Sequence, residues 1–178
     1  CWHFFSICSR AWMPVASIAG TCFIRRIRTF GGLPSSDTVS FKDAPVTVAI
    51  KGKGKFLSSI SFDGRQLPSA IVPDDTRMLR RIDLRLGPPT TPYLAAANAV
   101  VISPLYHPDT KRLEFDLESF AGHLIDLEIV SPTPSQNVAI DGRKATSGLT
   151  ELAVDGSYTI HLHHRASSKR SHYVVTVR

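Results

Sequence analysis

The sequence has no cysteine after Cys22 and no tryptophan after Trp12, so most of the chain lacks both residues. Without thiols, residues 39–178 cannot contain the Cys, Trp, Cys core of an antibody-like domain. The three cysteines, Cys1, Cys8 and Cys22, are odd in number and have no ligand-spaced partners. This argues against both a disulfide framework and a zinc site.

Long hydrophobic runs are also lacking. The run from Ala11 to Ile24 is interrupted by Pro14 and falls short of the roughly 20 residues that a membrane span needs. Most of the nearby positive charge follows this run, whereas a signal peptide carries its charge in front. We therefore expect no transmembrane span, and we interpret residues 1–38 as a separate apolar, helical segment with a linker.

Twelve prolines and 11 glycines punctuate the chain often enough to favour short strands over long helices. From Val39 onwards, apolar residues recur at every second position, which is typical of half-buried strands. The inward-facing sets are predicted to be Val46, Val48 and Ile50; Ile82, Leu84 and Leu86; Leu113, Phe115 and Leu117; and Ile125, Leu127 and Ile129. The predicted fold of residues 39–178 is an all-β, antiparallel β-sandwich.

Turn signals divide this sandwich into two similar halves. Asp63-Gly64-Arg65 and Asp141-Gly142-Arg143 both predict tight hairpins, since Asp-Gly tolerates positive φ. The Gly- and Pro-rich connector at residues 87–92 separates halves of about 39–90 and 91–178. Residues 111–119 and 125–129, joined by a short turn, are predicted to pair as another hairpin.

The net charge of +6 and the isoelectric point of about 9.5 predict a mild attraction to anionic partners. The lysines and arginines form several clumps along the chain, and no nucleic-acid reader motif accompanies them. A nucleic-acid partner is therefore disfavoured.

Outward carboxylates alternate with the apolar residues of the two later strands, namely Glu114, Asp116, Glu118, Asp126 and Glu128. Calcium would bridge such groups, but a solvated face paired with Arg81 and Arg85 is the favoured interpretation. His161 and His163 share one strand face and form the other weak metal candidate, beside Glu114 and Asp116. We expect no metal and no cofactor.

Catalytic motifs are missing as well. The serines form no Gly-x-Ser-x-Gly elbow, and the segment Lys51 to Lys55 lacks the spacing of a phosphate-binding loop. An enzyme is therefore disfavoured. Rings that stack on sugars need exposure, and Tyr93 and Tyr106 lie in proline-rich surroundings that favour it. These two are the predicted ligand-binding residues, whereas Tyr158 and Tyr173 are expected to complete the core.

The order of these signals resembles a known family. Val46 to Lys55, then Ser58 to Leu67, then Ile71-Val72-Pro73, resemble the C-terminal β-sandwich attached to many glycoside hydrolases with α/α-toroid catalytic domains. In that family the sandwich buttresses the catalytic domain and in some members contacts polysaccharide, while the catalytic carboxylates lie in the toroid. The resemblance implies that this chain is a fragment whose N-terminal apolar segment, within residues 1–30, is left from the last preceding helix, and it transfers no catalytic residue.

Three function hypotheses follow. The leading one is a non-catalytic, carbohydrate-associated accessory module that binds polysaccharide or buttresses a glycoside hydrolase, with an extracellular location favoured. The alternative is a structural or protein-interaction β-sandwich domain. The third is a metal-dependent enzyme that uses the His161 and His163 cluster.

Overall fold

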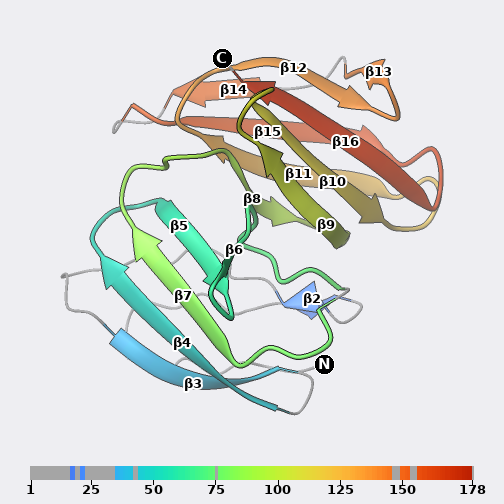
Figure 1. Ribbon diagram of the computed structural model, residues 1–178. Helices are drawn as coiled ribbons and strands as arrows, with labels where there is room; N and C mark the ends of the chain where they lie inside the picture. Colours follow the sequence, from blue (N-terminus) through green and yellow to red (C-terminus); the bar gives the residue numbers. More distant parts are fainter. Residues whose placement is uncertain are drawn as a thin grey trace.

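The computed structural model describes residues 17–18, 21–22, 35–41, 44–74, 76–145, 149–152 and 156–177. Within these ranges the regular structure consists of β-strands, most of them paired antiparallel, which confirms the prediction of an all-β fold (Figure 1). The same ranges hold no helix that is long and apolar enough to cross a membrane.

Little of the N-terminal segment lies within the described residues. Two short strands, β1 (Ser17–Ile18) and β2 (Thr21–Cys22), pair antiparallel with each other. The helix predicted for this segment otherwise falls on residues outside the described ranges, so it stays a prediction. The end of the predicted linker is part of a strand, because β3 begins at Ser35.

The first large sheet, which we call the β7 sheet, has the strand order β3-β4-β7-β5-β6. Its strands are β3 (Ser35–Phe41), β4 (Ala44–Gly52), β5 (Leu57–Phe62), β6 (Arg65–Gln66) and β7 (Arg81–Leu86). β7 inserts between β4 and β5 and runs parallel to β4, which departs from the antiparallel pairing expected throughout. The 53–56 turn, which we call the arch, therefore spans the width of one strand and passes over the end of β7.

The rest of the described chain forms two further sheets. The β11 sheet contains β8 (Tyr93–Ala97), β11 (Leu124–Ser131), β14 (Leu149–Leu152) and β15 (Tyr158–Arg165), in the order β14-β15-β11-β8. The β10 sheet contains β9 (Val100–His107), β10 (Arg112–Glu118), β12 (Ser135–Ile140), β13 (Arg143–Lys144) and β16 (Arg170–Val177), in the order β13-β12-β16-β10-β9. All pairings within these two sheets are antiparallel.

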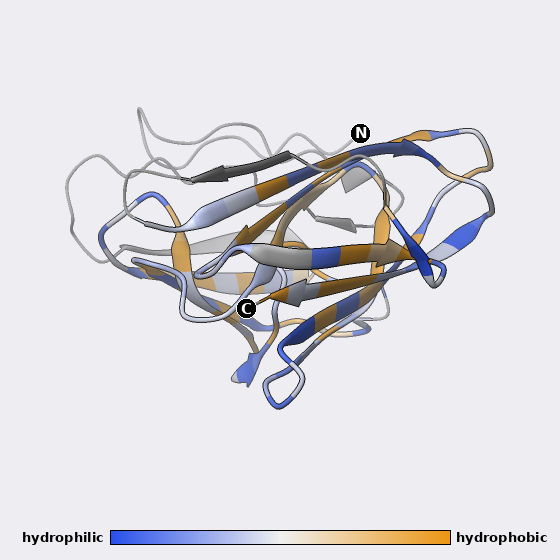
Figure 2. Ribbon diagram, turned by 90° about the horizontal axis from the view of Figure 1, so that it is seen from above, coloured by the Kyte–Doolittle hydropathy of each residue, from blue (hydrophilic) through white to orange (hydrophobic). Residues whose placement is uncertain are grey.

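The β10 and β11 sheets share one hydrophobic core and form a sandwich-like pair. Leu113, Phe115 and Leu117 from one sheet, and residues such as Ile125 and Leu127 from the other, are at most 2% exposed. Apolar and polar residues alternate along the strands, as Figure 2 shows. The predicted inward-facing sets of all four strands are confirmed, since each of those residues is buried.

One predicted pairing is wrong. β10 pairs with β9 and β16, whereas β11 pairs with β8 and β15, so the two strands predicted as a hairpin lie in different sheets. Both strands alternate with the same period and bury one face in the same core. Facing each other across that core satisfies the pattern as well as pairing side by side, and the short connection crosses between the sheets.

The β7 sheet packs against one end of the β11 sheet. Tyr93 and Val130 point into the core of the β7 sheet, while their chain neighbours Leu94 and Ile129 point into the sandwich core. Residues 69–72 lie between the two, joined to β8 by the hydrogen bonds that Ala70 donates to the Leu94 carbonyl, at 2.8 Å, and Leu94 donates to Pro68.

The two predicted Asp-Gly-Arg hairpins are confirmed and make the same contacts. Asp63 and Asp141 both adopt a φ of 50°. The amide of each aspartate donates to a carbonyl of the neighbouring strand at 2.8 Å, Arg81 in one case and His172 in the other, and each carboxylate accepts an amide hydrogen from that same residue. A turn aspartate thus fastens each hairpin to the next strand of its sheet.

Candidate functional site

The outward carboxylates divide between two faces because β10 and β11 lie in different sheets. Glu114, Asp116 and Glu118 stand on the outer face of the β10 sheet, and Asp126 and Glu128 on the outer face of the β11 sheet. The five carboxylates therefore do not form one array. Their expected pairing with Arg81 and Arg85 is wrong for Arg81, whose Nη2 lies 2.7 Å from Oδ1 of Asp83 on the same strand.

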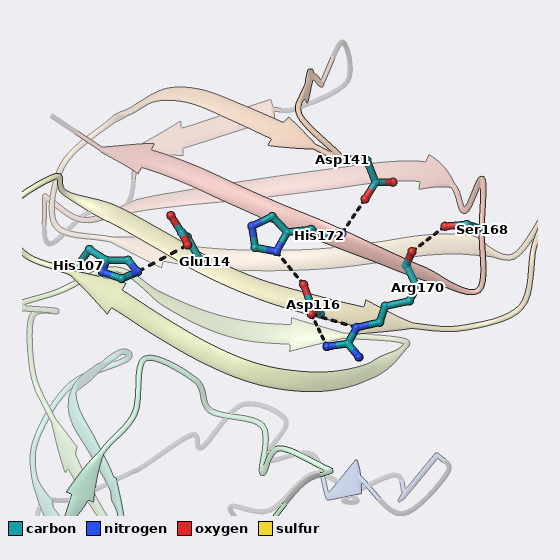
Figure 3. A network of polar contacts seen from close by, with 7 residues as sticks. All are labelled: His107, Glu114, Asp116, Asp141, Ser168, Arg170 and His172. Carbon is teal, nitrogen blue, oxygen red and sulfur yellow. Dashed lines mark hydrogen bonds and ion pairs between the residues drawn. The ribbon is translucent and has the colours of Figure 1, made fainter.

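On the β10 sheet, imidazoles and cations from flanking strands pair with the carboxylates (Figure 3). Asp116 Oδ1 lies 2.7 Å from His172 Nδ1, and its Oδ2 accepts hydrogen bonds from both Nε and Nη2 of Arg170. His107 Nε2 lies 3.5 Å from Glu114 Oε2, and Lys169 Nζ lies 2.9 Å from Glu118 Oε1. The network ties β10 to its neighbours on both sides.

His172 is fixed from two directions, since its backbone amide donates to Asp141 Oδ1 at 2.7 Å while its ring faces Asp116. The Nδ1 contact with a carboxylate directs Nε2 away from it, an arrangement that suits a general base. Both side chains stand on an open sheet face and are partly exposed, Asp116 by 21% and His172 by 50%. The Asp116–His172 pair therefore joins β10 to β16, and both side chains remain accessible to solvent.

Opposing effects act on Asp116. Partial burial raises the pKa of its carboxyl group, but the hydrogen bonds and charges of His172 and Arg170 outweigh burial and leave the pKa below its usual range. Because the folded pKa lies below the unfolded one, Asp116 stabilises the fold above about pH 4, and this contribution is lost as the pH falls through the folded pKa.

We predict that Asp116→Asn lowers the free energy of unfolding at pH 7 by about 1–2 kcal/mol, the scale of charge-assisted hydrogen bonds to a partly buried group. Because asparagine does not titrate, the difference from the parent chain should shrink towards pH 3. Urea denaturation at both pH values measures it. Asp109→Asn, on the exposed turn before β10, is the matched control and should change stability by less than about 0.5 kcal/mol. A loss independent of pH would contradict the assignment.

The four late histidines do not converge. His161 and His163 stand on the outer face of the β11 sheet, where His163 Nδ1 lies 3.3 Å from Asp126 Oδ1 and His161 is in register with Glu128. His164 Nε2 reaches 2.8 Å from the Tyr173 hydroxyl, and His172 belongs to the β10 sheet. Among the described residues, no three His, Cys, Asp or Glu side chains are grouped closely enough to hold a metal ion.

The two tyrosines predicted to bind ligand lie in strands and belong to different cores. Tyr93, on β8, is 6% exposed, packs in the core of the β7 sheet and accepts a hydrogen bond from the Leu57 amide at 3.2 Å. Tyr106, on β9, is half-buried against the sandwich core. Tyr93 therefore presents no exposed ring, and the role assigned to Tyr106 stays a prediction.

Tyr173 completes the core, as predicted. Its ring is 1% exposed and stacks on Phe115, with centroids 5.1 Å apart and an interplanar angle of 2°. Burial raises the pKa of the Tyr173 hydroxyl far above its usual range, with a further contribution from the charge of Asp141. The hydroxyl therefore stays protonated. Tyr158 is half-buried.

An exposed ring stands instead at the connection from β10 to β11, residues 119–123, which we call the crossover. Phe120 is 69% exposed, and Leu124, the first residue of β11, is 54% exposed. The imidazole of His123 lies against the Phe120 ring, with centroids 4.7 Å apart and planes at 50°. Two large apolar side chains thus lie close together in sequence on the surface, beside an imidazole.

Hydrogen bonds from three other segments hold the crossover in place. The β15–β16 connection contributes bonds in both directions, from the Gly122 amide to the Ala166 carbonyl at 2.9 Å and from the Ala166 amide to the His123 carbonyl at 2.8 Å. The Asn98 carbonyl oxygen lies 3.3 Å from His123 Nε2, and Asn98 Nδ2 donates to the carbonyl of Leu124, the residue after the crossover, at 2.8 Å. Arg165 Nη1 donates to the Gly122 carbonyl at 3.2 Å. The exposed Phe120 is therefore carried by a well-fastened loop.

The sequence indicates a hairpin turn from Ser119 to Gly122, so Phe120 is not among the residues predicted to bind a ligand. A hairpin turn has no reason to carry a large aromatic residue, so the phenylalanine was itself a signal. Phe120 stands on a connection between two sheets because β10 and β11 lie in opposite sheets. The alternation of apolar and polar residues does not reveal that placement.

Comparison with known proteins adds no family to these observations. No protein-family model, no curated protein and no solved structure matches the chain.

Proposed function

We propose that the chain is a non-catalytic, carbohydrate-associated accessory module that contacts glycan through the crossover. The observation that carries this proposal is the 69% exposure of Phe120 on a loop held by hydrogen bonds from the β15–β16 connection and from Asn98. Exposing a large aromatic ring on a pre-ordered loop favours binding, since little conformational entropy is lost when the ligand arrives.

The surroundings of Phe120 suit a sugar. The apolar face of a pyranose packs on an aromatic ring, and its hydroxyl groups require polar partners at the ring's edge. His123 lies against Phe120, and Arg165, in register with Leu124, brings a guanidinium group to the same end of the sheet. His123 Nε2 donates to the Asn98 carbonyl at 3.3 Å, and Arg165 Nη1 donates to the Gly122 carbonyl. The remaining imidazole nitrogen and the other guanidinium N–H groups are therefore the polar partners beside the stacking surface.

We expect Phe120→Ala to weaken binding to the recognised glycan by about tenfold or more, because a central aromatic contact carries a large share of such binding energy. Phe120→Trp should retain binding, since it preserves the stacking surface. A panel of neutral and acidic soluble glycans in affinity electrophoresis identifies the ligand, and calorimetric titration then gives the affinities.

Met78→Ala is the matched control, because Met78 is also 69% exposed but lies far along the chain on the connection before β7. This variant should bind as the parent chain does. If no glycan binds, or if Phe120→Ala binds as tightly as Met78→Ala, the proposal fails. A solution mass above that of a monomer that falls on Phe120→Ala would instead assign the crossover to protein interaction.

A further inference from the structure

Positive charge is concentrated in one part of the chain. Residues 35–92 contain nine basic and six acidic residues, a net charge of +3, whereas residues 93–177 contain seven basic and nine acidic residues, a net charge of −2. The part of the chain that forms the β7 sheet therefore has a net positive charge, whereas the part that forms the other two sheets has a net negative charge. Two of the basic clumps, residues 51–55 and 77–85, belong to this part of the chain that forms the β7 sheet.

The arch over β7 gathers several of these cations. Lys51, the second-last residue of β4, lies directly beside Arg85 of β7 in the parallel register. Lys53 and Lys55 follow within the arch. The arch lies close to the chain just after β7, since the Gly87 amide donates to the Phe56 carbonyl at 3.0 Å and a Cβ on Gly54 would lie 3.3 Å from Gly87 Cα. We call Lys51, Lys53, Lys55 and Arg85 the arch cations.

Within the described residues, no carboxylate lies within ion-pair distance of the arch cations. All four are exposed. Asp83 is the acidic residue next along β7 on the same face, and both of its oxygens accept hydrogen bonds from Arg81. These bonds are the main cause of the lowered pKa of Asp83, and the charge of Lys51 adds a smaller contribution. Lys55 lies 5.3 Å from the ring centroid of Phe56, a contact that leaves its charge in place.

Like charges that face each other on adjacent strands destabilise a sheet. Lys51 and Arg85 are such a pair. The arch, which contains Gly54, adds Lys53 and Lys55 at the same edge of the sheet. An anionic ligand would relieve this repulsion, because its charges would sit between the cations. The arrangement thus favours binding of a polyanion.

We propose that the arch cations form a second binding surface, which takes an acidic polysaccharide through its carboxylate or sulfate groups. The choice of a polysaccharide as the carrier of the negative charge rests on the function proposed above. The surface itself is separate from the crossover, and the two lie on opposite sides of the view in Figure 1. A long polymer can engage both, which raises its overall affinity.

The arch suits a polysaccharide better than a single-stranded nucleic acid. Proteins that bind single strands stack bases on exposed aromatic rings. The aromatic residue of the arch, Phe56, is 7% exposed and belongs to the core of the β7 sheet. The arch therefore offers charge without a stacking surface, which matches a polymer whose anionic groups are carried on sugar rings.

The test compares binding of polygalacturonate, neutral dextran and a DNA duplex at two salt concentrations. We expect polygalacturonate to bind more tightly than dextran, with an affinity that falls steeply as salt rises. The double variant Lys53→Glu, Lys55→Glu should weaken polygalacturonate binding by about tenfold or more. Lys144→Glu, an exposed charge reversal on β13 of the β10 sheet, is the control and should bind within about twofold of the parent chain.

The outcomes separate the two proposals. Equal weakening by the double variant and by Lys144→Glu, or preference for the DNA duplex, overturns the arch as an acidic-polysaccharide surface. Binding of a neutral glycan that depends on Phe120, without preference for polygalacturonate, overturns the arch and leaves the crossover function standing. If no glycan of either kind binds, both proposals fail.

Discussion

Replacing Phe115 by alanine should lower the free energy of unfolding by about 3–5 kcal/mol, the usual cost of deleting a buried aromatic ring. Phe115 is 1% exposed and stacks on Tyr173 from the adjacent strand. The Tyr173 hydroxyl in turn lies 2.8 Å from His164 Nε2, on a strand of the opposite sheet. Removing Phe115 therefore leaves a cavity beside the contact that joins the two sheets.

Urea denaturation monitored by far-ultraviolet circular dichroism measures this loss of unfolding free energy. Phe120→Ala is the matched control. Both variants delete the same side chain, but Phe120 is 69% exposed, so its removal should change stability by less than about 0.5 kcal/mol. A loss below about 1 kcal/mol for Phe115→Ala would contradict its place in the sandwich core.

Replacing Gly52 by alanine should cost about 2–5 kcal/mol. Gly52 has a φ of 87°, which costs an alanine about 1–2 kcal/mol. An added Cβ would also lie 2.4 Å from the Leu86 carbonyl oxygen, so β4 and β7 would have to separate at this end. Forcing such a contact adds about 1–3 kcal/mol.

Gly64→Ala separates these two costs. Gly64, in the β5–β6 turn, has a similar φ of 81°, but an added Cβ would meet no atom within 4 Å. The expected loss is only about 1–2 kcal/mol from the backbone conformation. Thermal and urea unfolding of both variants measure the difference. Equal losses would show that β4 does not press on β7 at Gly52.

Alternation was enough to assign strands and their buried faces. In β10, for example, Leu113, Phe115 and Leu117 could be identified as core residues because every second residue of a half-buried strand faces inward. The Asp-Gly turns were equally local, since two successive residues with positive φ depend on the turn itself. These features are fixed by residues close together in the sequence.

Partners could not be assigned in the same way. The insertion of β7 between β4 and β5, and the placement of β10 and β11 in different sheets, depend on contacts between residues far apart in the chain. Tyr93 was expected to be exposed because prolines precede it, yet it lies in β8 and packs into the core of the β7 sheet. Local composition does not reveal which surface a neighbouring sheet will cover.

The most direct test of the proposed module is the mapping of amide chemical shifts in an isotope-labelled chain as the glycan identified by the panel is added. If the crossover binds glycan, the largest changes should fall on Phe120, His123 and Leu124, together with the Ala166 amide that bonds to the crossover. Changes confined to other parts of the described fold, or no changes at saturating glycan, would contradict the proposal.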